Sequence, residues 1–355
     1  MYIYISRSKR GTVTLTVYVD DFIIAGDNLW LIDQVKDEFR QKYKMQDLGE
    51  MEFVLGLEVY QDISTKTIKL TQTRYITDML QKFGLSDSNP TPTPMQQNTL
   101  LSKSQCPKND VEKLEMEKVP YREAVGSLLW LANGTRPDIA YAVGQCARFL
   151  SNPGKAHWDA VKRIMRYLKG TSTIGITYNG NKEIVTYGFT KGDLPIQNPK
   201  INPQVFADAD YANDPDSRRS ITGYTYMLAG GPISWQSRQQ KSVALSTMEA
   251  EYMAACAATQ EAMWLRMLLH DLGMGADEPM VLNEDNQSCI AFAKSHGDHR
   301  RSKHIDVRYH FVNEKIGEKQ IVMKHVATEF QLADMLTKAL PPPLFINLRV
   351  MMLGE

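Results

Sequence analysis

Cysteine is scarce in this sequence, and long apolar runs are missing from it. Four cysteines are scattered over 355 residues without a CxxC pair, which excludes a small disulfide-stapled scaffold and predicts reduced thiols. No stretch of about 18 apolar residues is present, so we expect no transmembrane helix. The N-terminus, MYIYISRSKRG, lacks the apolar core of a secretory signal. We therefore expect an intracellular protein, cytoplasmic or nuclear, with no membrane partner.

An excess of charge of either sign is also missing. Lys plus Arg and Asp plus Glu each number 41, so the formal net charge is zero and a uniformly basic nucleic-acid coat is excluded. Contact with nucleic acid would need local clusters of Lys and Arg. A hydrophobic share of 43% and a charged share of 23% exclude disorder along the whole chain. At roughly 100–200 residues per domain, the length predicts two or three domains.

Residues 1–84 predict an α+β region. β-Branched and apolar residues at 12–19 and 22–25 predict a hairpin with Asp20 and Asp21 in its turn. The other elements expected in this region are helices at 29–43 and 71–83 and strands at 49–62 and 68–70.

Residues 85–170 change from a polar stretch to a helical one. Residues 85–118 are rich in Ser, Thr, Pro, Asn and Gln, which predicts a linker without a core of its own. Residues 119–170 predict a helical region with helices at 121–133, 137–150 and 155–168. The last helix carries a basic face that includes Lys162, Arg163 and Arg166. That face is either an ordinary solvated surface or a track for a phosphate backbone.

Residues 204–345 predict an α/β domain with one mixed sheet, after a loop-rich segment at 171–203. The expected strands are one carrying Asp208 and others at 221–228, 233–237 with 242–245, 280–283 and 320–326. The expected helices are at 247–272, from 286 through 293, at 305–316 and at 331–340.

Four acids fall at separate elements of this domain. They are Asp208 in the first strand, Glu251 in the long helix, Asp285 after the fourth strand and Asp334 near the start of the last helix. Buried carboxylates are costly together unless a cation neutralises them. Hard oxygen ligands suit Mg²⁺ or Mn²⁺, and two such ions can support an in-line phosphodiester displacement.

Five sequence blocks in this domain resemble the ribonuclease H domain of copia-type retrotransposon Pol polyproteins. In order, they are VFADADYANDPDSRRSITGY, ISWQSRQQKSVALSTMEAEYMA, EDNQSCIAFAK, SKHIDVRYHFVNEKI and QLADMLTKAL. The resemblance implies a ribonuclease H-like fold with a mixed five-stranded sheet and flanking helices. It also implies endonucleolytic cleavage of the RNA strand of RNA–DNA hybrids with two Mg²⁺ ions. The family's catalytic and metal-binding quartet corresponds to Asp208, Glu251, Asp285 and Asp334.

Two neighbouring acids compete with members of this quartet. Asp210 shares a strand face with Asp208, and we expect it to be a supporting residue or a loop anchor. Glu249 and Glu251 lie about 200° apart on a helix, so one of them faces the site. Glu251 occupies the family position, and Glu249 is expected to be a solvent charge or a capping partner near Ser246.

The histidines leave two further hypotheses open. His325 precedes the last predicted helix, and a structural or exposed role for it is favoured over a proton-shuttle role. His299, His304 and His310 lack a cysteine partner and lie among basic residues, so a substrate-facing basic helix is favoured over a zinc site.

The front of the chain resembles the palm of reverse transcriptases. Tyr18, Val19, Asp20 and Asp21 form the YxDD motif in the predicted hairpin, followed by FIIAGDN and LGEMEFVLGLEVYQD. The resemblance implies that Asp20 and Asp21 bind Mg²⁺ in a partial α+β palm ahead of a helical connection region.

The combined interpretation is a retrotransposon-derived fragment with a partial palm and a ribonuclease H nuclease. Its expected partner is an RNA–DNA hybrid, and other parts of the polyprotein are a further candidate partner. The residues expected to bind nucleic acid are Lys162, Arg163, Arg166, Arg218, Arg219, Arg300, Arg301 and Lys303. The alternative is a catalytically inactive remnant that binds nucleic acid or another partner.

We expect the chain alone not to polymerise DNA. The family palm needs a further aspartate upstream of the hairpin, and the 17 residues before Tyr18 contain no Asp or Glu. A primer-extension assay on the purified chain checks this, and template-dependent incorporation of nucleotides would contradict it.

Overall fold

The computed structural model describes residues 2–180, 203–275, 278–295 and 306–355. The chain divides into two compact units, Met1–Leu55 and Gly56–Glu355, and each is described by itself. Within the described ranges, no helix is long and apolar enough to span a bilayer.

The first unit contains an antiparallel sheet, and it confirms the predicted hairpin. The sheet is formed by β1 (Tyr2–Ser8), β2 (Gly11–Tyr18) and β3 (Asp21–Gly26), with Tyr18 opposite Asp21. Asp20 and Asp21 therefore lie at the turn, where both are exposed. The unit also holds α1 (Leu29–Lys42) and the short β4 (Phe53–Val54). The expected strand at 49–62 is interrupted, because Leu55 and Gly56 both have positive φ angles.

The second unit begins with an antiparallel ladder followed by helices. β5 (Leu57–Asp62), β6 (Thr67–Thr71) and β7 (Ile176–Asn179) pair in that order. The helices that follow β6 are α2 (Thr73–Lys82), α3 (Asp110–Glu117), α4 (Tyr121–Gly134), α5 (Ala140–Ala147) and α6 (Lys155–Gly170). The helix expected at 137–150 begins as the 3₁₀ turn η2 (Pro137–Ile139) and continues as α5.

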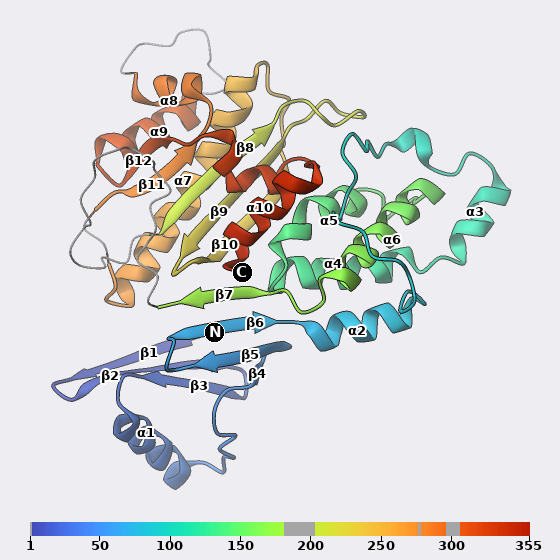
Figure 1. Ribbon diagram of the computed structural model, residues 1–355. Coiled ribbons are helices and arrows are strands. Elements are labelled where there is room, and N and C mark those ends of the chain that lie inside the picture. Colours follow the sequence, from blue (N-terminus) through green and yellow to red (C-terminus); the bar gives the residue numbers. More distant parts are fainter. Residues whose placement is uncertain (1, 181–202, 276–277, 296–305) are drawn as a thin grey trace. The chain divides into compact units, whose positions relative to one another are not determined.

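A mixed five-stranded sheet forms the rest of this unit and confirms the expected fold class. Its order is β10 (Gly231–Gln239), β9 (Ile221–Leu228), β8 (Gln204–Asp210), β11 (Met280–Glu284) and β12 (Ile321–His325) (Figure 1). The pairs β10–β9 and β9–β8 are antiparallel, whereas β8–β11 and β11–β12 are parallel. This order and these directions constitute a ribonuclease H-like sheet.

Helices cover both faces of the sheet. Successive side chains along a strand point to opposite faces, so each strand contributes apolar residues to two separate cores. Val205 and Ala207 on β8 belong to a core with Tyr252 and Leu265 of α7 (Thr247–Asp271). Two further helices, α8 (Gln287–Lys294) and α9 (Asp306–Gly317), complete that layer. Phe206 points to the opposite face, into a core shared with α10 (Pro342–Leu353) and the α4–α6 helices.

Two element predictions in this domain are wrong. The helix expected at 331–340 is the 3₁₀ turn η4 (Leu332–Leu336), and the closing helix is α10, which begins at Pro342 after Pro341. The two prolines fit the start of α10, where a missing N–H costs little. Residues 242–245, expected to extend the third strand, contain no strand.

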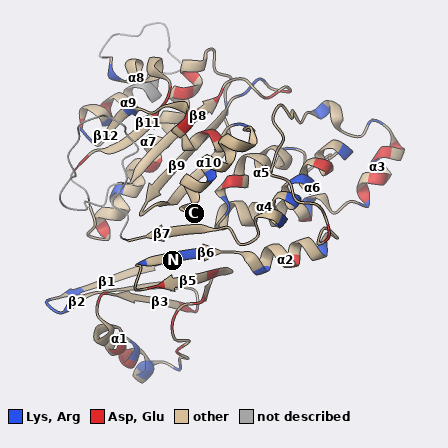
Figure 2. Ribbon diagram, in the orientation of Figure 1, with Lys and Arg blue, Asp and Glu red and all other residues tan. Residues whose placement is uncertain are grey.

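The polar segment expected as a linker lies against α6. Thr93, Met95 and Leu101 are buried. The basic side chains of α6 hold this segment: Arg163 donates to Thr93 Oγ1 (3.1 Å), Arg166 to the Asn89 carbonyl (2.6 Å) and Lys169 to the Ser88 carbonyl (2.7 Å). Lys and Arg line α6, as Figure 2 shows, but the side chains of Arg163, Arg166 and Lys169 form hydrogen bonds within the chain. The domain boundaries at 84, 118, 170 and 203 stay predictions.

A buried ion pair fixes the α4–α6 helices beside the sheet. Arg136 and Asp138 are both fully buried and form two hydrogen bonds, of 3.0 and 2.8 Å. The Tyr167 hydroxyl donates to the same carboxylate, and Arg349 of α10 donates to that hydroxyl at 3.4 Å. The network thus joins η2, α6 and α10.

We expect Asp138→Ala to destabilise the protein strongly, because Arg136 would remain buried without its counter-charge. The loss should be about 3–5 kcal/mol in the free energy of unfolding, measured by urea titration. Asp159→Ala is the matched control, since it removes an ion-pair partner of Lys162 on the exposed side of α6. The control should change stability by no more than about 1 kcal/mol. Equal losses in both variants would contradict the assigned role of the buried pair.

Candidate active site

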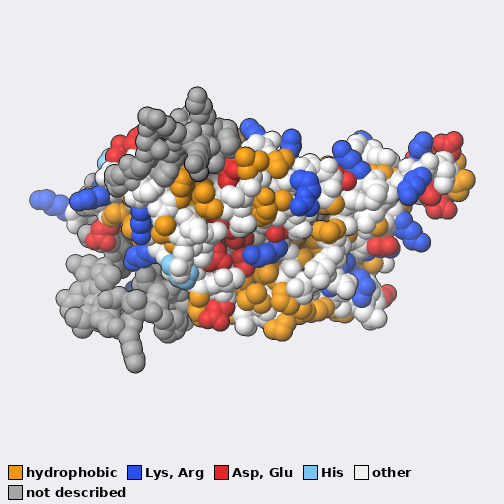
Figure 3. All heavy atoms as spheres, turned by 90° about the horizontal axis from the view of Figure 1, so that it is seen from above, with side chains coloured by type: hydrophobic (Ala, Val, Ile, Leu, Met, Phe, Trp, Pro, Cys, Tyr) orange, Lys and Arg blue, Asp and Glu red, His pale blue; other side chains and the backbone are white. Residues whose placement is uncertain are grey.

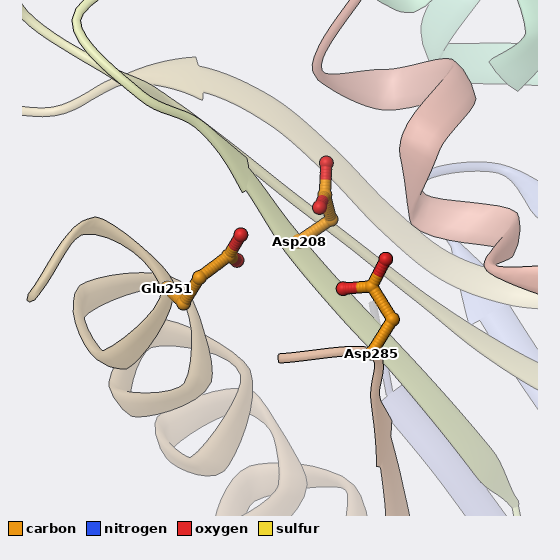
Figure 4. A group of neighbouring side chains, drawn as sticks. All are labelled: Asp208, Glu251 and Asp285. Carbon is orange, nitrogen blue, oxygen red and sulfur yellow. The ribbon is translucent and has the colours of Figure 1, made fainter. Parts of the chain in front are cut away.

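Three carboxylates meet at one edge of the five-stranded sheet. Asp208 comes from β8, Glu251 from the first turns of α7 and Asp285 from the residue after β11 (Figure 4). Each offers a ligand atom, and these atoms lie within 4.8 Å of one another. β8 and β11 are parallel neighbours, so their carboxyl ends reach the same edge of the sheet, where α7 also begins. Tertiary structure therefore gathers three of the four acids predicted from the sequence.

Each carboxylate of this trio is held by a donor. Glu251 Oε2 accepts a hydrogen bond from the Ala209 N–H at 2.7 Å. Asp285 Oδ2 accepts one from the Thr328 hydroxyl at 2.9 Å, and Asp208 Oδ2 accepts one from the Thr337 hydroxyl. These bonds orient the carboxylates before any ligand binds.

Asp334 approaches the same edge from η4 but has a different neighbour. The Lys338 ammonium lies 2.9 Å from Asp334 Oδ1 and 3.6 Å from Asp208 Oδ2. Among the residues described, the group able to share one metal ion contains the trio and omits Asp334.

The segment carrying Asp334 is fastened to the two strands that carry Asp208 and Asp285. The buried Gln331 carboxamide donates to the Ala207 carbonyl at 2.9 Å and to the Asn283 carbonyl at 3.5 Å. Gly223 gives η4 room, because an added Cβ there would lie 2.7 Å from Thr337 Cγ2. The sequence interpretation missed Gln331, since nothing in its spacing marks it.

Glu284 is a further acid that the sequence interpretation missed. It is fully buried at the end of β11, where Oε1 accepts from the Asn286 N–H at 3.1 Å and Oε2 has no hydrogen-bond partner among the described residues. Its only sequence signal is that it directly precedes Asp285.

Burial and mutual repulsion raise the pKa values of several of these acids. Burial raises the pKa of Glu251, and Asp208, Glu284 and Asp285 raise it further. Burial likewise raises the pKa of Glu284. Burial and Asp208 raise the pKa of Asp334 to about 8, against the opposing effect of Lys338. Glu251, Glu284 and Asp334 therefore hold their protons more strongly than free carboxyl groups, and a bound divalent cation would displace such protons.

The competing acids have structural partners. Asp210 accepts a hydrogen bond from Asn213 in the loop after β8, as expected of a loop anchor. Glu249 Oε2 accepts from the Leu245 N–H at 2.7 Å, and the Glu249 N–H donates to Ser246. Glu249 is buried, so the capping alternative matches the structure and the solvent-charge alternative does not.

The remaining candidates are dispersed. Arg218 and Arg219 are exposed in the β8–β9 loop, and His325 is exposed at the end of β12. Asp20 and Asp21 belong to the first unit. His310, on α9, is exposed. The remaining five candidates lie outside the described residues: His299, Arg300, Arg301, Lys303 and His304.

Comparison with known proteins gives a consistent relationship over most of the chain. The family model described as "Reverse transcriptase (RNA-dependent DNA polymerase)" matches residues 1–97. The retrovirus-related Pol polyprotein from transposon TNT 1-94 of Nicotiana tabacum is 41% identical over 96% of this chain and 24% of its own length. The corresponding polyprotein from transposon RE1 of Arabidopsis thaliana is 34% identical over 97% of this chain and 22% of its own. The chain thus spans about a quarter of the length of these relatives.

A shorter relative is covered more fully. The putative transposon Ty5-1 protein YCL074W of Saccharomyces cerevisiae is 30% identical over 73% of this chain and 77% of its own length. Among solved structures, LC11-RNase H1 from compost aligns with 38% of this chain at 14% identity and a TM-score of 0.30. That likeness is too low to carry an argument, and the fold assignment rests on the strand order.

We expect the metal-free protein to lose stability as the pH rises. The folded-state pKa of Glu251 is raised, so the folded protein keeps a proton that the unfolded chain releases above about pH 4.5. The contribution of this retained proton to the free energy of unfolding is fully present below about pH 4.5. It is lost progressively as the pH rises toward the folded-state pKa of Glu251. In EDTA, Glu251→Gln should make the fall in unfolding free energy between about pH 5.5 and 8 shallower, by at most about 1.4 kcal/mol per pH unit.

The matched control for this measurement is Glu329→Gln, the same change at an exposed position of η3 (Thr328–Phe330). It should leave the slope unchanged. Urea unfolding at each pH gives the free energies, and parallel curves for wild type and Glu251→Gln would refute the assignment.

Proposed function

The chain belongs to the family of retrotransposon Pol polyproteins, and we propose that its five-stranded sheet carries a nuclease that hydrolyses the RNA strand of an RNA–DNA hybrid with divalent metal ions. The observation that supports this most directly is the convergence of Asp208, Glu251 and Asp285 within 4.8 Å. The proposal concerns this chain, which is a fraction of the polyproteins that it resembles.

The donor set fits Mg²⁺ or Mn²⁺. All the converging groups are carboxylates, which are hard oxygen ligands of the kind these ions prefer. The buried Oε2 of Glu284, which has no hydrogen-bond partner among the described residues, offers a further carboxyl oxygen beside the trio. Two bound ions would supply an activated water and stabilisation of the leaving oxygen in an in-line displacement at phosphorus.

The residues of the chain would contribute positioning and charge. Asp208, Glu251 and Asp285 would hold an ion in fixed geometry, because their donors already orient them. Asp334 would extend the acidic site toward η4, with Gln331 fixing that turn to the strands. In the hydrolysis, the oxygen of a water molecule would form a bond to one phosphorus of the RNA strand, and the bond between that phosphorus and a ribose oxygen would break. The protons of the water would remain on the two products.

The surface around the acids offers cations for a nucleic-acid backbone. Figure 3 shows acidic side chains near the middle of one face, with Lys and Arg side chains on either side of them. Lys294, Lys324 and His325 line a shallow hollow beside β12, and Arg218 and Arg219 are exposed in the β8–β9 loop. We propose that these side chains, rather than the engaged Arg163 and Arg166, contact phosphates. A proton-shuttle role for His325 stays a prediction.

Asp285→Asn should abolish cleavage without abolishing binding. The variant keeps the shape of the side chain but removes a charge from the metal-binding trio, so the cleavage rate should fall at least about 100-fold. The assay follows a labelled RNA–DNA hybrid with Mg²⁺, and hybrid binding is measured separately in EDTA. Asp271→Asn, at the exposed end of α7, is the matched control and should cleave like wild type. If wild type and Asp285→Asn bind the hybrid but neither cleaves it, the chain is a binding module instead.

A further inference from the structure

The four acids at the sheet edge separate into two arrangements that share Asp208. Asp208, Glu251 and Asp285 face one another, and within the described part of the chain no Lys or Arg side chain forms an ion pair with Glu251 or Asp285. On its other side, Asp208 shares a side-chain cation with Asp334, because the Lys338 ammonium lies 3.6 and 2.9 Å from their respective oxygens. One half of the acidic site is therefore open to an ion, and the other half already contains a positive charge.

The local backbone places this ammonium. Lys338 follows Asp334 by four residues, and its N–H donates to the Asp334 carbonyl at 3.1 Å, so one helical turn brings both side chains to the same side. The neighbouring Thr337 hydroxyl donates to Asp208 and is fully buried. The Lys338 side chain is one-third exposed, which leaves it a path out to solvent.

We propose that Lys338 acts as a built-in cation that occupies the position between Asp208 and Asp334 and restricts tight divalent-metal binding to the Asp208–Glu251–Asp285 trio. A second ion would bind between Asp208 and Asp334 only after the ammonium has withdrawn. The inference rests on the proposed function, because it assumes that the trio binds a metal ion. The family resemblance implies two Mg²⁺ ions, and the proposal makes binding of the second ion depend on the position of Lys338.

The physical reason is exclusion by volume and charge. A divalent ion must approach carboxylate oxygens to about 2.0–2.6 Å, which the ammonium prevents while it lies between them. The positive charge also repels a second cation at this range more strongly than it would in bulk water. Once the lysine side chain has left, both carboxylates become available as ligands.

The test counts Mn²⁺ ions bound by the full chain. Free Mn²⁺ is followed by electron paramagnetic resonance during titration of wild type, Lys338→Met and Lys338→Arg at about pH 7.5. We expect one tightly bound ion in wild type and in Lys338→Arg. Lys338→Met should bind a second ion with a Kd at least tenfold lower than the second Kd of wild type. Equal numbers of ions and equal Kd values in wild type and Lys338→Met would overturn the proposal.

Two control variants locate the ions. In the Lys338→Met background, Asp334→Asn should remove the second ion, whereas Asp285→Asn should weaken the first. A second ion that persists with Asp334→Asn would overturn the placement. If wild type binds no Mn²⁺, both this inference and the proposed metal site fail. If the binding pattern holds but the hybrid is not cleaved, the proposed nuclease function fails and the role of Lys338 stands.

Discussion

Mutual repulsion among buried carboxylates is the constraint to which the surrounding structure responds. Asp208, Glu251, Glu284 and Asp334 are all nearly inaccessible to solvent, and desolvation raises the cost of every negative charge among them. The fold offsets part of that cost with a backbone N–H for Glu251, hydroxyl donors for Asp208 and Asp285, and the ammonium of Lys338. Part of the cost stays uncompensated within the described residues, where Glu284 Oε2 has no hydrogen-bond partner, and the proposed divalent cation would offset it.

Holding these charges together requires rigid support from elements far apart in the chain. The parallel register of β8 and β11 sets the separation of Asp208 and Asp285, and the Gln331 carboxamide ties η4 to both strands. Behind η4, the core formed by α4–α6 and α10 continues into the sheet through Phe206 and Ile221. The Arg136–Asp138 pair and its contacts to Tyr167 and Arg349 fix that support, so helices distant from the acids help to hold them in place.

The basic residues show why charge in a sequence is ambiguous. Arg163 and Arg166 had the spacing of a phosphate track on α6, yet both donate to the polar segment at 88–93. That segment, typical of a linker in composition, is instead ordered by these donors. Helical periodicity indicates which residues share a face but not what covers that face. The exposed Arg218 and Arg219 had no stronger sequence signal than the α6 residues, and only their exposure distinguishes them.

The hairpin at 12–25, the mixed five-stranded sheet and the candidacy of Asp208, Glu251 and Asp285 could be predicted from the sequence, because strand alternation and family-like blocks are local properties of a chain. The sequence interpretation placed the closing helix at 331–340, where the apolar residues have helical spacing. The structure has the 3₁₀ turn η4 there, and the helix α10 begins only at Pro342, because Pro341 and Pro342 suit the start of a helix and not its interior. Glu284, Gln331 and Lys338 became part of the site only in the tertiary structure. Their roles depend on which oxygen or ammonium group meets them across the fold, and that distance is set by sheet register and packing rather than by spacing along the chain.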